Sequence, residues 1–320
     1  MSLQLRMMLL IGALFAIIYA AIVLIGTAMG MRDFYFYLMV SVGLMWIQFM
    51  AGPKIIEWTM RLQYIKREDN PKLWDMVQDL ARRANMPLPR VCISPSPLPN
   101  AFAFGRGIND GRVCVCRGIL NLLDEDELRA VLGHELAHIK NRDMVTITLL
   151  SVVPMIMYRV AWHFMWYGGG RRNDRNAPSG AVIGLAAFLF YFITNLLVLY
   201  GSRIREYYAD KGSVEMGNKP SALASALYKL VYGSARMADT EEMKQVEGMK
   251  AFFPNDPSRA LNEIRDLKQL DTDHSGTIDN SELLRLRNKQ LVLGTGEKLM
   301  ELLSTHPNML KRIKHLSELK

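Results

Sequence analysis

Residues 124–142 read DEDELRAVLGHELAHIKNR and contain the five-residue motif His-Glu-Leu-Ala-His at positions 134–138. The apolar residues of this stretch recur every three or four positions, which predicts an amphipathic helix. On such a helix His134 and His138 lie one turn apart, and Glu135 lies about 100° around the axis from His134. Two imidazoles with this spacing can bind one Zn²⁺, and the carboxylate can reach a water on the metal. The motif therefore predicts two metal ligands and a general base.

Two further signals support this prediction. Asp124 and Glu127 have the spacing of a capping box, so the start of the helix is specified locally. A catalytic Zn²⁺ also needs a third protein ligand, and residues 205–210, REYYAD, place a glutamate and an aspartate four positions apart. Such a pair can supply a ligand and an outer carboxylate. The alternative is that His134 and His138 are ordinary surface residues of an amphipathic helix.

Four segments together resemble the HtpX-type membrane zinc metallopeptidases, which are relatives of the CAAX prenyl proteases. They are HELAH at 134–138, REYYAD at 205–210, PNAFAFG at 99–105 and THPNMLKRI at 305–313, in that family's order. The resemblance implies that Glu206 is the third zinc ligand and that Asp210 orients a ligating histidine.

The same resemblance assigns roles to two other segments. It implies that His306 and Arg312 lie near the active site and position substrate or stabilise the oxyanion. The alternative for this pair is a helix cap and a surface cation. It also implies an edge strand beside the zinc, along which a substrate peptide lies. This strand contains Asn100, Ala101, Phe102 and Ala103.

These assignments define a chemistry and a fold class. Zn²⁺ lowers the pKa of a water molecule, so that Glu135 can accept its proton and later return it to the leaving amine. The expected enzyme is a zinc metalloendopeptidase with one catalytic Zn²⁺. The expected fold is a zincin-like α+β domain that is mainly helical.

Long apolar segments predict an integral membrane protein. Residues 9–30 carry no charge and are long enough to cross a bilayer, and residues 34–52 follow after a short connection. Residues 144–167 and 181–200 predict a second hairpin, for which a pair of core helices or an interfacial hairpin is the alternative. About four transmembrane helices are therefore expected.

Charge flanking these segments predicts the orientation. Lysines and arginines are in excess on the side of the membrane that carries the helix of His134 and His138, the metal helix. This excess predicts a multi-pass cell-membrane protein whose catalytic domain lies in the cytoplasm. Arg171, Arg172 and Arg175, between the third and fourth segments, argue the other way. The net charge of +8 is explained by membrane-flanking cations, and no nucleic-acid motif accompanies it. The expected partners are the lipid bilayer and protein substrates, with no nucleic acid.

Residues 271–282, DTDHSGTIDNSE, have the pattern of an EF-hand calcium loop, with Gly276 at the turn position. The ligand positions are filled by Asp271, Asp273, Ser275, Thr277 through its carbonyl, Asp279 and Glu282. The pattern predicts Ca²⁺ binding and calcium-modulated activity. A degenerate loop that has lost the ion is the alternative, because EF-hands commonly work in pairs and this chain shows one such pattern.

The expected organisation has six segments. They are an N-terminal transmembrane hairpin (1–53), a first catalytic segment with the metal helix (54–143), a second hydrophobic hairpin (144–200), a second catalytic segment with the third zinc ligand (201–258), an EF-hand-like insertion (259–295) and a C-terminal catalytic segment (296–320). The resemblance implies that misfolded or damaged membrane proteins are the substrates, as in proteolytic quality control under stress. Prenyl-protein processing and a calcium-responsive membrane scaffold with a vestigial zinc site are the alternatives.

Overall fold

The fold is described from a computed structural model that covers residues 34–167, 180–236, 264, 267, 270–288 and 294–319. The chain forms two compact units. The unit that contains the predicted catalytic residues, named the catalytic unit for that reason, comprises Ala51–Val145, Arg203–Glu301 and His306–Lys320. The helical unit comprises Met1–Met50, Thr146–Ser202 and Leu302–Thr305. Every candidate site residue belongs to the catalytic unit. The first predicted span, 9–30, lies outside the described residues.

The catalytic unit contains a four-stranded sheet in the order β1-β2-β4-β3. The strands are β1 (Gln63–Tyr64), β2 (Arg90–Ser94), β3 (Ala101–Phe104) and β4 (Arg112–Cys116). β2 and β4 run parallel, whereas β1 and β3 are antiparallel to their neighbours. β3 is therefore an edge strand among the described strands, as the substrate-strand prediction requires.

The register of β3 determines which of its main-chain groups face the open edge. The N–H of Cys116 donates to the carbonyl of Asn100, and Phe102 lies opposite Cys114. Because bonding alternates along an antiparallel pair, the even-numbered residues of β3 bond to β4. The N–H and C=O groups of Ala101 and Ala103 consequently point away from the sheet.

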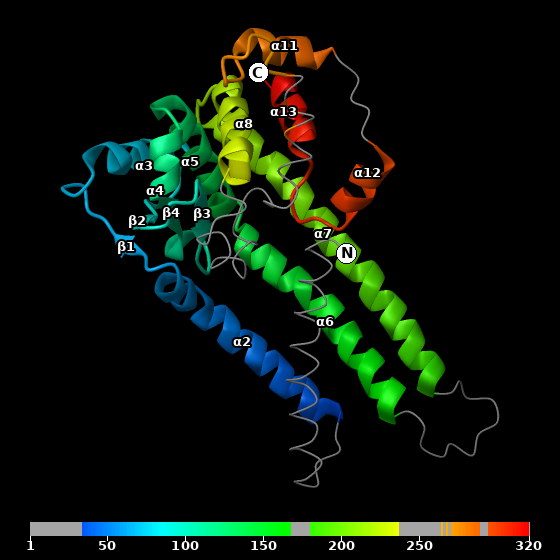
Figure 1. The fold of residues 1–320 in the computed structure, drawn as a ribbon. Helices are drawn as coiled ribbons and strands as arrows, with labels where there is room; N and C mark the ends of the chain where they lie inside the picture. Colours follow the sequence, from blue (N-terminus) through cyan, green and yellow to red (C-terminus); the bar gives the residue numbers. More distant parts are fainter. Residues whose placement is uncertain are drawn as a thin grey trace, which may run out of the picture. The chain divides into compact units, whose positions relative to one another are not determined.

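Helices cover the sheet and form most of the core. Those of the catalytic unit include α3 (Pro71–Arg83), α4 (Arg117–Leu122), α5 (Glu125–Lys140), α8 (Pro220–Arg236), α11 (Asn280–Arg287) and α13 (Met309–Glu318). Two further elements are a short 3-10 turn, η1 (Ile108–Asp110), and helix α12 (Thr295–Leu302). α5 packs on β3 and β4 and also contacts α3 and α8, and α13 packs against α8 and α11 (Figure 1). This mainly helical architecture with a small sheet confirms the predicted α+β, mainly helical composition of the fold.

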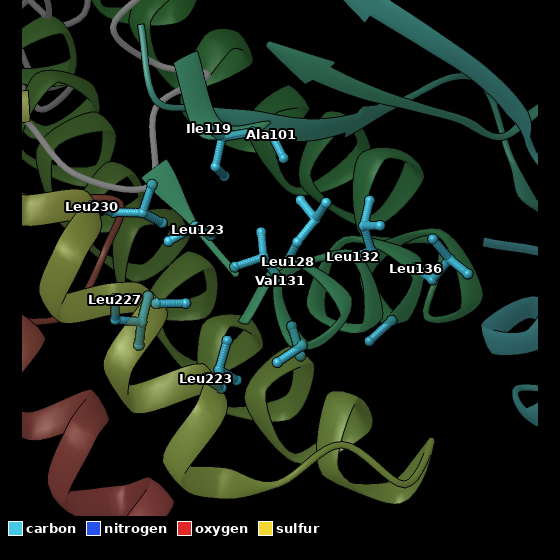
Figure 2. Packing of buried hydrophobic residues seen from close by; sticks show 14 of the residues in the cluster. Ala101, Ile119, Leu123, Leu128, Val131, Leu132, Leu136, Leu223, Leu227 and Leu230 are labelled. Atoms are coloured by element: carbon cyan, nitrogen blue, oxygen red, sulfur yellow. The ribbon is translucent and has the colours of Figure 1, made fainter. Parts of the chain in front are cut away.

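Apolar side chains of α5 and α8 interlock at the centre of the catalytic unit. Figure 2 shows Leu128 and Val131 of α5 on the side of α8, which contributes Leu223, Leu227 and Leu230, whereas Leu132 and Leu136 lie farther along α5. All of them belong to one core cluster with Ala101 of β3, Ile119 and Leu123. All of these side chains are buried. The predicted apolar face is therefore buried, and so are the residues between its members, because every position from 130 to 137 is buried. α5 is thus a central helix of the catalytic unit, buried on more than the one face that an amphipathic surface helix buries.

Two glycines allow α5 to approach the last turns of helix α7 (Gly180–Glu215). A Cβ added at Gly133 would lie 2.4 Å from Asn218 Nδ2 and 2.8 Å from Ser213 Oγ, and one added at Gly212 would lie 2.6 Å from Ala137 Cβ. Ser213 Oγ also donates a hydrogen bond of 2.6 Å to the carbonyl of Ala130. This close approach brings the REYYAD segment of α7 beside the histidines of α5.

The helical unit contains most of α2 (Phe34–Thr59) and α6 (Asp143–Tyr167) and the N-terminal half of α7. α6 and α7 lie side by side (Figure 1), with the rings of Tyr158 and Tyr191 5.4 Å apart. Within the described residues one helix, Val182–Glu215, has the length and apolar composition needed to cross a membrane. The predicted segments 34–52, 144–167 and 181–200 are all helical, and the count of four spans stays a prediction.

Candidate metal centre

Helix α5, which carries the histidines, has well-defined ends. The carboxylate of Asp124 accepts a hydrogen bond from the Glu127 N–H, and the Glu127 carboxylate accepts one from the Asp124 N–H, which confirms the predicted capping box. At the other end Asn141 is the C-cap and Arg142 adopts a left-handed φ of 56°. This turn places Asp143, the first residue of α6, next to the end of the metal helix.

The three predicted zinc ligands, His134, His138 and Glu206, lie close together. His134 Nε2 and His138 Nε2 lie 3.1 Å apart, and they are each 3.6 Å from an oxygen of Glu206, Oε2 and Oε1 respectively. A tetrahedral Zn²⁺ with bonds of about 2.0–2.1 Å separates its ligand atoms by roughly 3.3 Å. Both oxygens of the buried Glu206 carboxylate face the histidines, Oε2 toward His134 and Oε1 toward His138. The donor set therefore fits Zn²⁺.

Each histidine has its own carboxylate at Nδ1. Asp210 Oδ1 lies 2.9 Å from His134 Nδ1, and Asp143 Oδ2 lies 2.6 Å from His138 Nδ1. Such contacts favour the tautomer with hydrogen on Nδ1, so the Nε2 lone pair is directed toward the metal. The family resemblance predicts Asp210, whereas no motif predicts Asp143. The available signal was its position, directly after the asparagine-arginine turn that ends the metal helix.

The pocket favours positive charge. Burial alone lowers the pKa of His134, but hydrogen bonds with Asp210 and Glu206 outweigh it and raise the pKa to about 9. Burial raises the pKa of Glu206, but His306 and Arg312 outweigh it and hold the pKa well below its ordinary value. Glu206 is therefore ionised despite its burial. An ionised carboxylate beside two imidazoles is the charge arrangement that a divalent cation requires.

Glu135, the predicted base, is buried next to the three ligands. Its Oε2 accepts a hydrogen bond of 2.8 Å from the backbone N–H of Ala103. Burial raises the pKa of Glu135, and the neighbouring histidines and this hydrogen bond oppose the rise without cancelling it. A carboxylate with a raised pKa is suited to taking up and returning a proton near neutral pH.

Arg312 is completely buried on α13, which excludes the surface-cation alternative. Its Nε and Nη2 donate to the two oxygens of Asp210 at 3.0 and 2.6 Å, and its Nη1 lies 3.1 Å from Glu206 Oε2. Its cationic form is strongly favoured, because these carboxylates outweigh desolvation and raise the pKa of the guanidinium. Arg312 is thus the counter-charge of two carboxylates that serve the metal site.

His306 also lies beside the ligand set. Its Nδ1 is 3.3 Å from Glu206 Oε2, and its side chain is 24% exposed. The helix-cap alternative is wrong, because the side chain of Asn308 caps α13 by accepting a hydrogen bond from the Leu310 N–H. His306 is therefore more exposed than His134, His138 and Arg312.

The predicted substrate segment meets the site through its main chain. Ala103 contacts Glu135, whereas the ring of Phe102 packs 5.7 Å from that of Phe104 in a separate apolar cluster. Asn100 is buried, and Ala101 belongs to the main core. The edge strand therefore lies beside Glu135, and the binding of a substrate peptide along it stays a prediction.

The EF-hand-like loop forms a separate group of carboxylates. One carboxylate oxygen each of Asp271, Asp273 and Glu282 lies within 4.8 Å of the other two. Gly276 has a φ of 78°, and its N–H donates 3.0 Å to Asp271 Oδ2. Asp279 caps α11, which follows the loop, whereas the residues just before the loop lie mostly outside the described part of the chain. Ser275 Oγ lies 3.4 Å from the carbonyl of Thr277.

Comparison with known proteins gives the family. The profile of peptidase family M48 matches residues 67–320. A protein named Protease HtpX homolog from Methanothermobacter thermautotrophicus is 51% identical over 230 residues, which are 72% of this chain and 86% of that protein. This chain belongs to peptidase family M48.

As an M48 member the chain is a metallopeptidase, a hydrolase. A second Protease HtpX homolog, from Moorella thermoacetica, is 33% identical over 276 residues, covering 85% of this chain and 80% of that protein. The crystal structure of S. mikatae Ste24p aligns with a TM-score of 0.47 at 16% identity, over 98% of this chain and 64% of that one. The M48 match contains all the residues of the candidate metal centre.

Proposed function

We propose that this M48 peptidase is an integral-membrane, zinc-dependent endopeptidase. The observation that carries the proposal is the convergence of His134 Nε2, His138 Nε2 and the Glu206 carboxylate at ligand spacing, with Glu135 next to them. A scaffold with a vestigial site has no need to keep four such groups together in a buried pocket. Hydrolysis therefore explains the arrangement better than a purely structural role.

The residues divide the chemistry among themselves. A bound Zn²⁺ acidifies water and polarises the substrate carbonyl. Glu135, held at Oε2 by Ala103, takes the proton of the attacking water and later delivers it to the leaving amine. His306 is partly exposed and so can donate to the developing oxyanion. Arg312 is buried behind the ligands and therefore acts on Asp210 and Glu206 instead of touching substrate.

The test separates metal binding from turnover. Detergent-purified protein, loaded with zinc, is compared with Glu135→Gln and His134→Ala for zinc content and casein cleavage. Glu135→Gln should keep its zinc and lose cleavage by at least about 10²-fold, because it removes only the proton acceptor. His134→Ala should lose both. Cleavage by Glu135→Gln at the normal rate would overturn the proposal.

A membrane setting and a membrane-protein substrate belong to the same proposal. Large apolar side chains of α7 are exposed, including Leu185, Phe188 and Leu197. Such a surface is suited to lipid. With the excess of flanking lysine and arginine on the metal side, we infer a cytoplasmic active site that hydrolyses misfolded or damaged membrane proteins.

Cysteine labelling tests the orientation. The native residues Cys92, Cys114 and Cys116 are buried, so an introduced cysteine can be labelled selectively. Lys219→Cys, at an exposed site of the catalytic unit, should react with an impermeant maleimide only after cells are permeabilised. Asn173→Cys, between α6 and α7, should react in intact cells. The reverse pattern would overturn the cytoplasmic assignment.

Calcium modulation is a second proposed function, favoured by the packing of α11. This helix, which follows the EF-hand-like loop, contacts α13, the helix that carries Arg312. Leu283 and Leu286 of α11 share a core cluster with Ile313 of α13. Tyr228 of α8 donates a hydrogen bond of 2.9 Å to Asp271, the first loop position. An ion in the loop would thus stabilise α11 and, through its packing, the helix α13 that positions Arg312.

Titration calorimetry with CaCl₂ and casein cleavage with and without Ca²⁺ test this function. Wild-type protein should bind Ca²⁺ and cleave casein faster in its presence, and Asp271→Ala should lose both effects. Glu318→Ala, at the end of α13 and outside the loop, is the control that should keep them. If wild-type protein shows no heat of Ca²⁺ binding and cleaves casein at the same rate with and without Ca²⁺, calcium modulation is wrong.

A further inference from the structure

We propose that the backbone N–H of Ala103 is a positioning group for Glu135, so that the strand that receives the substrate also aligns the general base. This inference rests on the proposed peptidase function. It adds a residue that acts through its main chain, and it fixes the register of the substrate.

The register of β3 makes this N–H available. Ala103 lies opposite Val113 in the antiparallel pair, at a position whose N–H and C=O point away from β4. An outward N–H on an edge strand has no partner in its own sheet. At Ala103 it donates to Glu135 Oε2 at 2.8 Å.

This contact can hold the carboxylate more firmly than packing alone. Glu135 has three side-chain torsions, whereas the donor is fixed by the pairing of Phe102 and Phe104 with β4. A hydrogen bond to an ionised carboxylate is also among the stronger ones in proteins. A base that must face a water on the metal gains rate from such alignment, because small displacements of reacting groups slow the reaction.

The contact also selects the attacked carbonyl. A substrate strand pairing antiparallel with β3 finds the N–H and C=O of Ala101 and the C=O of Ala103, but the N–H of Ala103 is already donated to Glu135. The substrate residue opposite Ala103 therefore keeps its own carbonyl free of main-chain bonding. This carbonyl lies next to the base, so the geometry assigns the scissile bond to that residue.

Removing one N–H at a time tests the proposal. Ala103 is replaced by lactic acid through nonsense suppression, which changes the amide to an ester, and the same change at Ala101 is the matched control. Both esters weaken a carbonyl that bonds to β4, that of Phe102 or Asn100, so their structural cost is similar. The ester at 103 should lower kcat about tenfold with little change in KM. The ester at 101 should raise KM with kcat retained. An unchanged kcat for the ester at 103 would overturn the proposal.

Hydrogen exchange provides a measurement that needs no activity. In zinc-loaded protein without substrate, the Ala103 amide should exchange slowly, and Glu135→Ala should accelerate its exchange at least about tenfold. The Ala101 amide should exchange at the same rate in both proteins. Equal exchange of the Ala103 amide in both proteins would overturn the proposal. Cleavage by Glu135→Gln would overturn the peptidase function instead, and the exchange result would still report on this contact.

Discussion

Asp143 serves two metal-bearing helices at once. Its carboxylate contacts His138 Nδ1 at 2.6 Å, and its backbone carbonyl accepts a hydrogen bond of 2.7 Å from Arg205, the residue before Glu206. The aspartate thereby links the end of α5 to the turn of α7 that supplies the third ligand. One residue outside every recognisable motif thus contacts both segments, through its side chain on α5 and through its backbone carbonyl on α7.

We expect Asp143→Ala to lower zinc affinity by about 10–100-fold, because His138 loses the partner that sets its tautomer and orientation. Competition with a chromophoric chelator measures the affinity. Asp126→Ala is the control, since Asp126 is exposed on α5 and pairs with Lys219. An affinity equal to that of wild-type protein would show that the contact with His138 has no effect on the metal.

Asp110, in the connection between β3 and β4, predicts how the free energy of unfolding changes at acidic pH. Burial raises its pKa, but hydrogen bonds from Arg106 and Arg112 outweigh burial and lower the pKa from 3.8 to about 2. A carboxyl group with a depressed folded pKa stabilises the fold above its unfolded pKa. That stability is lost as the pH falls from about 4 to about 2. Asp110→Asn should therefore flatten this region of the curve of unfolding free energy against pH, by about 1–2 kcal/mol after allowance for partial exposure. Chemical denaturation monitored by tryptophan fluorescence provides the measurement, and a curve as steep as that of wild-type protein would contradict it.

Helices and strands were predictable where their signals are local. The span 124–142 differs from α5 (Glu125–Lys140) only at its ends, because a capping box and a left-handed residue delimit the helix. The contact between Ala103 and Glu135 was not predictable in the same way. Motifs name both segments, but the hydrogen bond depends on how α5 packs on β3, over a separation of 32 residues.

Gly133 is the position where α5 has least room. A methyl group there meets Asn218 and Ser213, so Gly133→Ala should destabilise the catalytic unit by about 1–3 kcal/mol and displace the adjacent His134. Thermal unfolding and zinc content measure the two effects. Gly43→Ala, in α2, places its methyl group in open space and should leave both unchanged. If Gly133→Ala retains wild-type stability and zinc, the close approach of α5 and α7 is not required.

Across the whole chain, the metal centre is assembled from segments far apart in sequence. Arg312 bonds to Asp210 over 102 residues and also reaches Glu206. The family resemblance named all three residues, but the sequence could not show that the arginine is buried against the two carboxylates. Burial of this ion pair is a property of the folded catalytic unit.

Arg312→Met should therefore be strongly destabilising, by about 3–5 kcal/mol, because it leaves two buried carboxylates without their counter-charge. The decrease in the free energy of unfolding should be larger in EDTA than with zinc, since a bound cation also neutralises the charge of Glu206. Thermal unfolding in both conditions is the measurement, and Arg285→Met on the exposed side of α11 is the control. Equal losses with and without zinc would contradict the shared role of arginine and metal.

The distance along the chain between Asp210 and Arg312 also sets an order of events during synthesis. Both histidines, the base and the third ligand leave the ribosome well before residue 312 is added. Until that residue has emerged and α13 has packed, two carboxylates of the site lack their cation. Each newly synthesised molecule therefore completes its metal centre late, after nearly all of the described chain has been translated.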